Sequence, residues 1–258
     1  MAAGSKIEWT QATWNPITGC TRVSEGCRHC YAERLTATRL AHLDKYKGLA
    51  RMNGKGEARW TGKLRFHPDV LEQPYRWRKP RLVFVNSMSD MFHEDLSLDI
   101  ILKVFKVMNE CPQHTFQILT KRPAIAAKFS PALNWTPNIW MGTSVENMLV
   151  SHRIRDLKQT KAKVRFLSLE PLLGPMPKLP LSGIHWVIVG GESGPGARPM
   201  EADWVKPIRD RCVSQNVPFF FKQWGGVQKK KFGRRLDNRT WDEFPCLKSS
   251  NGKKENVA

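Results

Sequence analysis

The run LVFVNSMSD at residues 82–90 decides the fold, because four apolar residues are followed at once by polar ones. Such short runs of branched and aromatic residues are typical of buried strands, and the polar residues mark where the strand ends. The next segment, residues 96–109, carries Ile101, Phe105 and Met108 at helical spacing. A buried strand followed by an amphipathic helix predicts a βαβ unit with parallel strands.

The same pattern recurs on both sides of this unit. Further strands are predicted at residues 12–15, 115–119, 138–141, 164–167, 185–189 and 218–221, and further helices at 31–46 and 203–215. Strands that alternate with helices form parallel sheets. We therefore expect an α/β fold, a partial or closed (β/α) barrel of about six or seven parallel strands, with a doubly wound open sheet as the alternative.

One domain would account for most of the chain. We expect a single (β/α) barrel over residues 1–247, with a basic insertion near residues 47–81. Within it, the glycine-rich stretch 47–63 is expected to be a basic insertion or a flexible loop. Residues 248–258 are polar and are expected to form a disordered tail.

Three of the six cysteines, Cys20, Cys27 and Cys30, lie within eleven residues. Three thiolates on one loop can hold three corners of a cubane iron–sulfur cluster and leave the fourth iron open to a small ligand. A zinc site would need a fourth ligand, for which His29 is too close to Cys30 and His42 is distant in sequence. The spacing favours the cluster over zinc, over a disulfide and over unligated core cysteines.

The chain is strongly basic, with 42 Lys and Arg against 23 Asp and Glu and a net charge of +19. The excess is concentrated at residues 39–81 and 222–239, where aromatic residues are interspersed. Positive charge neutralises phosphates and flat rings stack on bases, so we expect a nucleic-acid partner, with a merely solvated basic face as the alternative. The candidate contacts are Arg59, Lys63, Arg65, Arg76, Arg78, Lys121, Arg122, Arg198, Lys222, Trp224, Lys229, Lys230 and Lys231.

Neither a signal peptide nor an apolar stretch of bilayer length is visible in the sequence. We therefore expect a cytoplasmic protein without membrane association, and a monomer. Reducing conditions there favour metal ligation by thiols over disulfides.

Polar residues follow every predicted strand, and in a parallel barrel such strand ends meet at one rim, where chemistry collects. Gly190, Gly191 and Glu192 follow the sixth strand. Their glycine amides could approach a ligand closely and the carboxylate could hold an ammonium group, whereas an ordinary tight turn is the alternative.

The cysteine spacing, with the ring of His29 just before Cys30, resembles the radical S-adenosylmethionine motif, although the first gap is three residues longer than usual. The stretches KIEWT (6–10), TWNPITGC (13–20), SLEPL (168–172) and GGESG (190–194) resemble a phage- and bacteria-associated three-cysteine-motif family of unassigned function. This second resemblance extends over most of the chain.

The resemblance implies a [4Fe–4S] cluster on the three cysteines, with S-adenosyl-L-methionine on its fourth iron. The residues that it implies as cofactor-binding are Asn86, Ser87, Ser89 and Asp90 after the second strand, and Ser144 and Glu146 at the ribose. The Gly-Gly-Glu element usually follows the second strand of such enzymes. Gly190, Gly191 and Glu192 follow a late strand, so their cofactor role cannot be transferred directly.

The resemblance further implies a 5′-deoxyadenosyl radical that acts on nucleic acid, with DNA favoured over RNA. DNA lesion repair, as in the spore photoproduct lyase branch, and base modification are the expected reactions, and a reductase or a flavodoxin-like protein would donate the electron. An extruded base could be replaced in the stack by an aromatic ring. The rings considered are those of Trp60, Tyr75, Trp77 and Trp224. The alternative is a non-catalytic, zinc-stabilised nucleic-acid-binding protein, and no catalytic residue is assigned.

Overall fold

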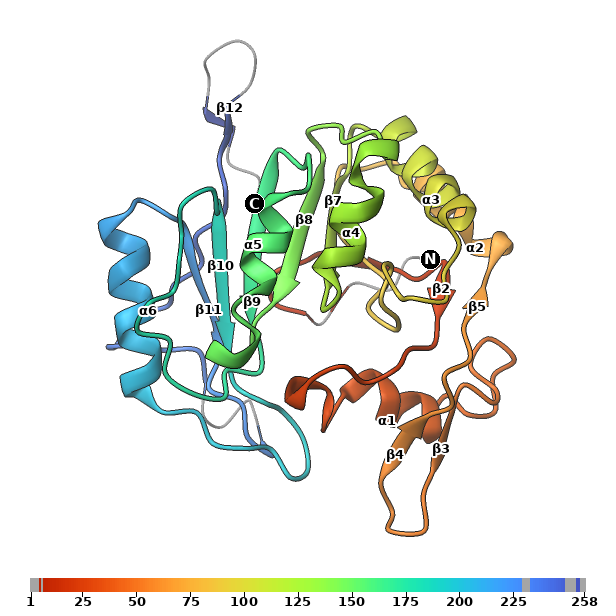
Figure 1. Cartoon of the computed structure of the whole chain (residues 1–258), viewed down its shortest axis with the longest axis horizontal. Helices are drawn as coiled ribbons and strands as arrows, with labels where there is room; N and C mark the ends of the chain where they lie inside the picture. Colours follow the sequence, from red (N-terminus) through yellow and green to blue (C-terminus); the bar gives the residue numbers. More distant parts are fainter. Residues whose placement is uncertain (1–4, 6, 229–232, 249–253, 256–258) are drawn as a thin grey trace.

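Seven strands form one parallel sheet in the order β1-β6-β7-β8-β9-β10-β11 in a computed structural model that describes residues 5, 7–228, 233–248 and 254–255. The strands are Ala12–Trp14, Leu82–Val85, Thr115–Thr120, Ile139–Ser144, Val164–Leu169, Trp186–Gly190 and Phe219–Gln223. The sheet curls, and within the described residues its edge strands β1 and β11 do not pair (Figure 1). The predicted partial barrel is confirmed, and the predicted strands differ from these only at their ends.

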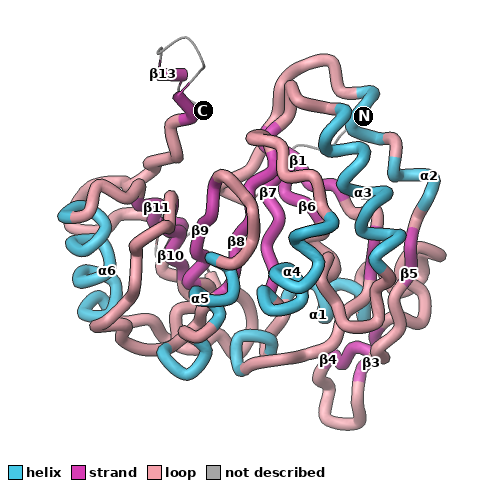
Figure 2. Tube along the Cα trace, turned by 45° about the horizontal axis from the view of Figure 1, so that its top comes forward, coloured by secondary structure: helices cyan, strands magenta, loops and turns pink. Residues whose placement is uncertain are grey.

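Four helices cover the convex face of the sheet (Figure 2). They are α3 (Leu98–Glu110), α4 (Pro123–Phe129), α5 (Arg153–Lys158) and α6 (Ala202–Ser214). The amphipathic pattern of α3 turns Ile101, Phe105 and Met108 toward the sheet, where all three are buried. Each of these helices joins two neighbouring strands, as in βαβ units. The helices α3 and α6 were predicted at residues 96–109 and 203–215, whereas α4 and α5 were not predicted.

Aromatic side chains fill the concave side of the sheet. Trp140, Phe166, Trp186 and Phe220 form a cluster separate from the core that lies under the helices. Trp9 joins this cluster from outside the sheet, with its ring centroid 4.7 Å from that of Phe84. Because side chains alternate between the faces of a strand, the residues beyond these rings on the same face reach the carboxyl rim of the sheet.

The segment between β1 and β6 differs most from the prediction. The helix expected at residues 31–46 is confirmed only as α1 (Tyr31–Ala37), and α2 (Pro68–Leu71) is a single turn. The stretch expected as a loop contains an antiparallel hairpin of β3 (Ala50–Met52) and β4 (Ala58–Trp60). A second antiparallel pair joins β2 (Ile17–Thr18) to β5 (Arg65–Phe66). These strands of two or three residues are too short to give a recognisable sequence period.

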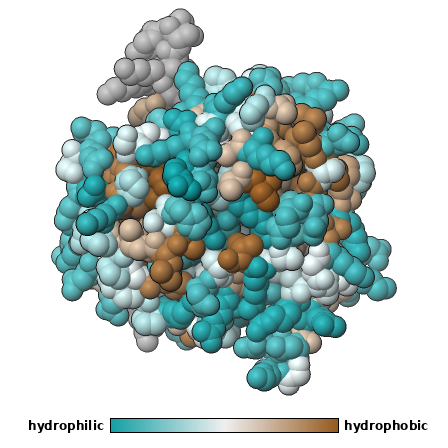
Figure 3. All heavy atoms as spheres, viewed as in Figure 1, coloured by the Kyte–Doolittle hydropathy of each residue, from teal (hydrophilic) through white to brown (hydrophobic). Residues whose placement is uncertain are grey.

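Several smaller elements complete the described chain. Four 3₁₀ turns lie at Glu25–Cys27, Gln73–Arg76, Ser130–Ala132 and Met148–Val150. Strands β12 (Leu247–Lys248) and β13 (Lys254–Glu255) pair with each other, whereas most of the tail predicted at residues 248–258 lies outside the described residues. Among the described helices, none combines the length and the apolar character needed to cross a bilayer. The surface seen in Figure 3 is largely hydrophilic, with separate apolar groups.

A substitution at Gly142 tests the packing on the concave side of the sheet, because a Cβ at this position would lie 2.4 Å from the ring of Phe166. Gly142→Ala should therefore overpack the concave core and lower the free energy of unfolding by about 1–3 kcal/mol. Urea unfolding followed by tryptophan fluorescence measures this change. Gly54→Ala is the matched control, since no atom lies within 4 Å of the added Cβ. Equal unfolding midpoints for the two variants would contradict the packing described here.

Candidate cofactor and substrate site

The carboxyl ends of the strands point toward the cysteine loop and α1 (Figure 1). Cys20, Cys27 and Cys30 line one cavity of about 150 Å³ together with residues from the ends of β6, β7 and β8. All three are free cysteines and are partly buried. The structure thus brings the three thiols to the rim of the barrel, where the predicted cofactor residues also lie.

The three cysteine thiols are the donor set that the cavity offers to a metal group. In the described residues, no three His, Cys, Asp or Glu side chains are grouped closely enough to hold one metal ion. An iron–sulfur cube carries its three thiolates on different irons, so the sulfur atoms lie farther apart than around one tetrahedral zinc. His29 Nδ1 is 2.8 Å from Glu192 Oε2 and His42 is exposed, so neither is placed as a fourth ligand.

The thiols lie in an environment that opposes their negative charge. Burial, and then the nearby Asp90 carboxylate, raise the pKa of Cys20 to about 12 despite the opposing effect of Arg122. Burial also raises the pKa of Cys30, and Lys121 opposes that shift. A bound metal inverts this situation, because its positive charge deprotonates the thiols that coordinate it.

Arg122 anchors the cysteine loop to the sheet. Its guanidinium is 3.1 Å from Asp90 Oδ2 and 3.9 Å from Cys20 Sγ, donates to Thr21, and pairs with Glu94. Asp90 also accepts hydrogen bonds from Thr120 Oγ1 at 2.6 Å and from the Lys121 amide at 3.0 Å. These contacts use the Arg122 side chain, which is only 6% exposed, inside the fold. Its contact with nucleic acid remains a prediction.

Glu146 is a second buried anchor. Its carboxylate accepts a hydrogen bond from Ser24 Oγ at 2.8 Å and is paired with Arg153 at 3.0 Å and Lys121 at 3.4 Å. Gly26 lies against it so closely that a Cβ would be 2.2 Å from Glu146 Oε1. The ribose role expected for Glu146 remains a prediction, but both carboxylate oxygens already have partners. Ser144, the last residue of β8, lines the small cavity.

Glu192 joins the end of β10 to the cysteine loop. It pairs with Arg198 and with His29 Nδ1. Burial raises the pKa of Glu192, but the hydrogen bonds from Arg198 and His29 outweigh burial and hold it at about 2. The Glu192 carboxylate is therefore already bound by the Arg198 guanidinium and by the His29 ring.

The two glycines before Glu192 allow close packing of the rim. A Cβ on Gly191 would be 2.0 Å from the Trp224 carbonyl oxygen, and one on Gly190 would be 2.6 Å from Glu170 Oε1. These close approaches explain the Gly-Gly pair without a ligand. Its cofactor role remains a prediction.

Asn86, one of the residues predicted to bind the cofactor, has a side-chain amide N–H group without a hydrogen-bond partner among the described residues. Its backbone is in the left-handed region, with φ at 59°, and its Oδ1 accepts from the Ile17 amide at 3.3 Å. Its buried Nδ2 has no hydrogen-bond partner among the described residues, and Asn86 lines the small cavity. Buried amide groups without partners are costly, so this atom fits a ligand acceptor. The neighbouring Ser87 and Ser89 donate to Asn15 Oδ1 and to the Ile17 carbonyl.

The residues predicted to bind nucleic acid divide into two groups. Lys63, Arg76 and Arg78 are exposed. Others are engaged in the fold: Arg59 with Glu57, Arg65 with the Asp44 and Lys47 carbonyls, Lys121 with Glu146, Arg198 with Glu192, Lys222 with Glu170, and Trp224 Nε1 with the Arg235 carbonyl. Lys229, Lys230 and Lys231 lie outside the described residues.

The aromatic rings expected near an extruded base also divide. Trp77 is only 8% exposed, which corrects its proposed role in base stacking. Tyr75 is 44% exposed, and the prediction for it and for the partly exposed Trp60 and Trp224 is unaffected.

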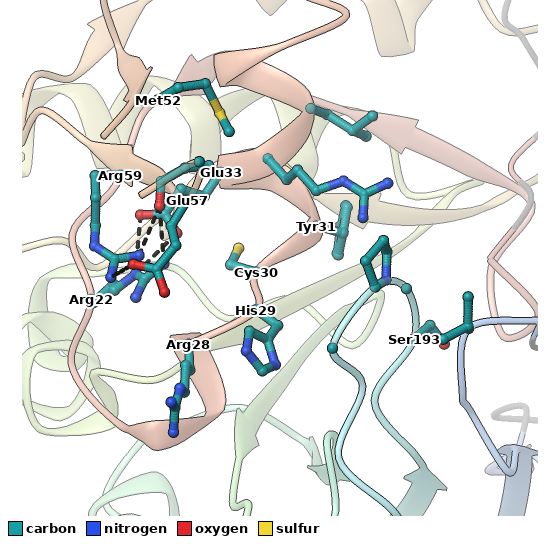
Figure 4. Close-up of a pocket in the computed structure, with 18 of the residues that line it drawn as sticks. Arg22, Arg28, His29, Cys30, Tyr31, Glu33, Met52, Glu57, Arg59 and Ser193 are labelled. Carbon is teal, nitrogen blue, oxygen red and sulfur yellow. Dashed lines mark hydrogen bonds and ion pairs between the residues drawn. The ribbon is translucent and has the colours of Figure 1, made fainter. Parts of the chain in front are cut away.

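A larger cavity of about 560 Å³ lies on the other side of Cys30 and Tyr31, between α1 and the loops after β10 and β11 (Figure 4). Sequence reasoning missed its lining residues Arg22, Arg28 and Arg34. It also missed Glu33, which is buried on α1 and accepts from Arg22 Nε at 2.9 Å. The sequence did contain a signal for Glu33, because its carboxylate stands among small and apolar residues of a short helix. Acids that are buried in this way are almost always paired with a cation.

The fold and the rim define this chain as an α/β partial-barrel protein with a three-cysteine loop at the carboxyl ends of its strands. It belongs to the family described as Protein of unknown function (DUF5131), whose model matches residues 4–245. This match confirms the expectation of a family without an assigned function. No curated protein sequence is similar enough to count as a match.

Solved structures with a similar fold include several of spore photoproduct lyase. A tyrosine-to-phenylalanine mutant has a TM-score of 0.48 and 12% identity, and the alignment covers 82% of this chain and 63% of that one. A double mutant with bound AdoMet and dinucleoside spore photoproduct has a TM-score of 0.46 at the same identity and coverage. A cysteine-to-serine mutant has a TM-score of 0.46 at 12% identity, over 74% of this chain and 58% of that one. The chain thus spans about three fifths of the length of these structures.

Glu146→Gln tests the anchoring of the cysteine loop. Removing the buried charge leaves Lys121 and Arg153 without their counter-ion, so the free energy of unfolding should fall by about 3–5 kcal/mol. The loop should loosen as well, and the metal-free protein should react faster with a thiol reagent. Glu25→Gln is the control, because the Glu25 side chain is 68% exposed and its ion pair should contribute about 0–1 kcal/mol. Unchanged stability together with unchanged thiol reactivity would exclude an anchoring role.

Glu192 gives a pH-dependent prediction. Its pKa of about 2 lies below the value of about 4.3 in an unfolded chain, so its stabilising effect is complete above about pH 4.5 and is lost as the pH falls toward 2. Glu192→Gln should lower the free energy of unfolding by about 1–3 kcal/mol at pH 7, and the difference from wild type should shrink below pH 4.5. Urea titrations at several pH values measure it, with the exposed Glu72→Gln as control. A difference independent of pH would argue against the ion pair.

Proposed function

We propose that this protein is a radical S-adenosylmethionine iron–sulfur enzyme that acts on nucleic acid, by DNA lesion repair or base modification. The observation that carries the proposal is the convergence of Cys20, Cys27 and Cys30 on one cavity at the carboxyl rim of a parallel partial barrel. Three thiols on one loop, with no fourth ligand grouped with them in the part of the chain that the structure describes, suit a cluster with one open iron, which is an arrangement for chemistry.

The side chains around the thiols support the cluster. Lys121 and Arg122 bring positive charge to the cysteines, which would offset the negative charge of a thiolate-ligated cluster. Arg122, Glu146 and Glu192 hold the cysteine loop at three separate points, through Thr21, Ser24 and His29. The loop is therefore held in place before any cofactor binds, which lowers the cost of ordering it.

Asn86 and Ser144 are the proposed contacts for S-adenosylmethionine. Asn86 offers a buried amide donor without a partner among the described residues, and Ser144 lies on the rim strand two positions beyond Gly142. Both line the cavity that holds the thiols. When bound, the cluster and S-adenosylmethionine would supply a one-electron cleavage that yields a carbon radical able to take a hydrogen atom from the substrate.

Nucleic acid is the proposed substrate because of the charge of the chain. A net charge of +19 attracts a polyanion, and the exposed Lys63, Arg76 and Arg78 are available for phosphate contacts. A thymine methyl or methylene group is a suitable hydrogen source, which makes a DNA lesion an attractive target. The electron would come from a reductase or a flavodoxin-like donor.

Replacing any one of the three cysteines tests the cofactor proposal. Cys20→Ala, Cys27→Ala and Cys30→Ala should each lower iron and sulfide content at least tenfold after anaerobic reconstitution and should abolish the broad visible absorbance of the wild type. Reduction of the wild type in the presence of S-adenosylmethionine should release 5′-deoxyadenosine, and these variants should release none.

Cys246→Ser is the matched control, because Cys246 is exposed and distant in sequence from the loop. It should load iron and sulfide as the wild type does. A colourless wild-type protein that retains one zinc and does not bind S-adenosylmethionine would instead support the zinc-stabilised nucleic-acid-binding alternative.

A further inference from the structure

We propose that the cavity of about 560 Å³ beside α1 receives the target nucleotide of the substrate, with Arg28 and Arg34 as its phosphate ligands. This inference rests on the proposed function and adds where, and through which residues, a phosphate-bearing substrate is held. A cavity of this size suits one nucleotide, since sites for small ligands measure roughly 300–1,000 Å³.

The charge of the lining favours a phosphate. Arg22, Arg28, Arg34 and Arg59 line the cavity against only two acids, Glu33 and Glu57. Both acids are already neutralised by arginines of the same lining, since Arg22 pairs with Glu33 and Arg59 pairs with Glu57.

Arg28 and Arg34 are left as uncompensated cations. Neither guanidinium has a hydrogen bond or an ion pair among the residues that the structure describes. Unpaired guanidinium groups bind phosphate through paired, charge-assisted hydrogen bonds. S-adenosylmethionine carries a sulfonium cation, so an arginine-rich lining is less suitable for it than for a nucleotide.

The position of the cavity suits a substrate of the rim chemistry. Cys30 and Tyr31 line both the large cavity and the small one that holds the three thiols. The Tyr31 hydroxyl donates to the Ser87 carbonyl at 2.7 Å, which ties the start of α1 to the end of β6. A nucleotide in the large cavity would therefore lie next to the proposed cofactor site, on the far side of one thiol and one ring.

The walls offer surfaces for a base as well as for a phosphate. The β3–β4 hairpin contributes Met52 (Figure 4) and Ala58. The loops after β10 and β11 contribute Pro195 and Val227. Met52 and Val227 are 44% and 69% exposed, so apolar surface remains open at the mouth. The exposed Arg51 and Lys55 of the hairpin extend the positive charge outward along the path of a strand.

Binding of a fluorescein-labelled oligothymidylate to the protein before reconstitution tests the proposal. Arg28→Gln and Arg34→Gln should each raise the dissociation constant about 3- to 10-fold, and the double variant should raise it at least 10-fold and flatten its salt dependence by about two phosphate contacts. Arg34→Lys should recover part of the loss. Arg155→Gln is the control, an exposed arginine of α5 that does not line the cavity, and should change the constant less than twofold.

Competition by a mononucleotide and the binding of S-adenosylmethionine show which ligand the two arginines contact. Competition by thymidine monophosphate that weakens in the double variant, in parallel with oligonucleotide binding, would support a nucleotide in the cavity. Oligonucleotide binding that the double variant leaves unchanged, with wild-type unfolding midpoints, overturns the proposal. So does a loss of S-adenosylmethionine affinity in the double variant with oligonucleotide binding intact.

Iron and sulfide analysis of the same preparations distinguishes this proposal from the proposed function. Arginine-dependent binding by a protein that loads no cluster would leave the cavity as a nucleotide site and reject the radical chemistry. A protein that loads the cluster but binds the oligonucleotide independently of Arg28 and Arg34 would support the radical chemistry and reject the nucleotide site.

Discussion

The buried carboxylate of Glu146 is the contact on which the geometry of the rim depends. It lies between Lys121 on one strand end and Arg153 on the next helix, and it also holds the Ser24 hydroxyl of the cysteine loop. A charge removed from water in this way is tolerated only while all its partners stay in place. The ion pair therefore couples the position of the loop to the packing of β7, β8 and α5.

Two further carboxylates repeat the arrangement at other points of the rim. Asp90 holds Arg122, which reaches Thr21, and Glu192 holds His29. Each of the three acids follows a strand of the sheet and reaches a different part of the loop that carries the cysteines. The loop has little regular structure of its own, so the strand ends supply the order that its short 3₁₀ turn cannot.

Much of the fold could be predicted, because buried parallel strands are apolar runs and their order in the sheet follows their order along the chain. LVFV at residues 82–85 agrees with β6 to the residue. The hairpin at residues 50–60 could not be predicted, because each of its strands is only three residues long and shows no recognisable sequence period. The three cysteines were visible from spacing, whereas the burial of Arg122 was not, since its partners Asp90 and Glu94 lie about thirty residues away in sequence.

The aromatic cluster on the concave side limits where a ligand can enter the barrel. Trp140, Trp186 and Phe166 are fully buried there, and Trp9 closes over them from the amino-terminal side. The barrel is therefore closed at that end by packed rings. A ligand that binds near the three cysteines cannot thread through the barrel from the amino-terminal ends of the strands.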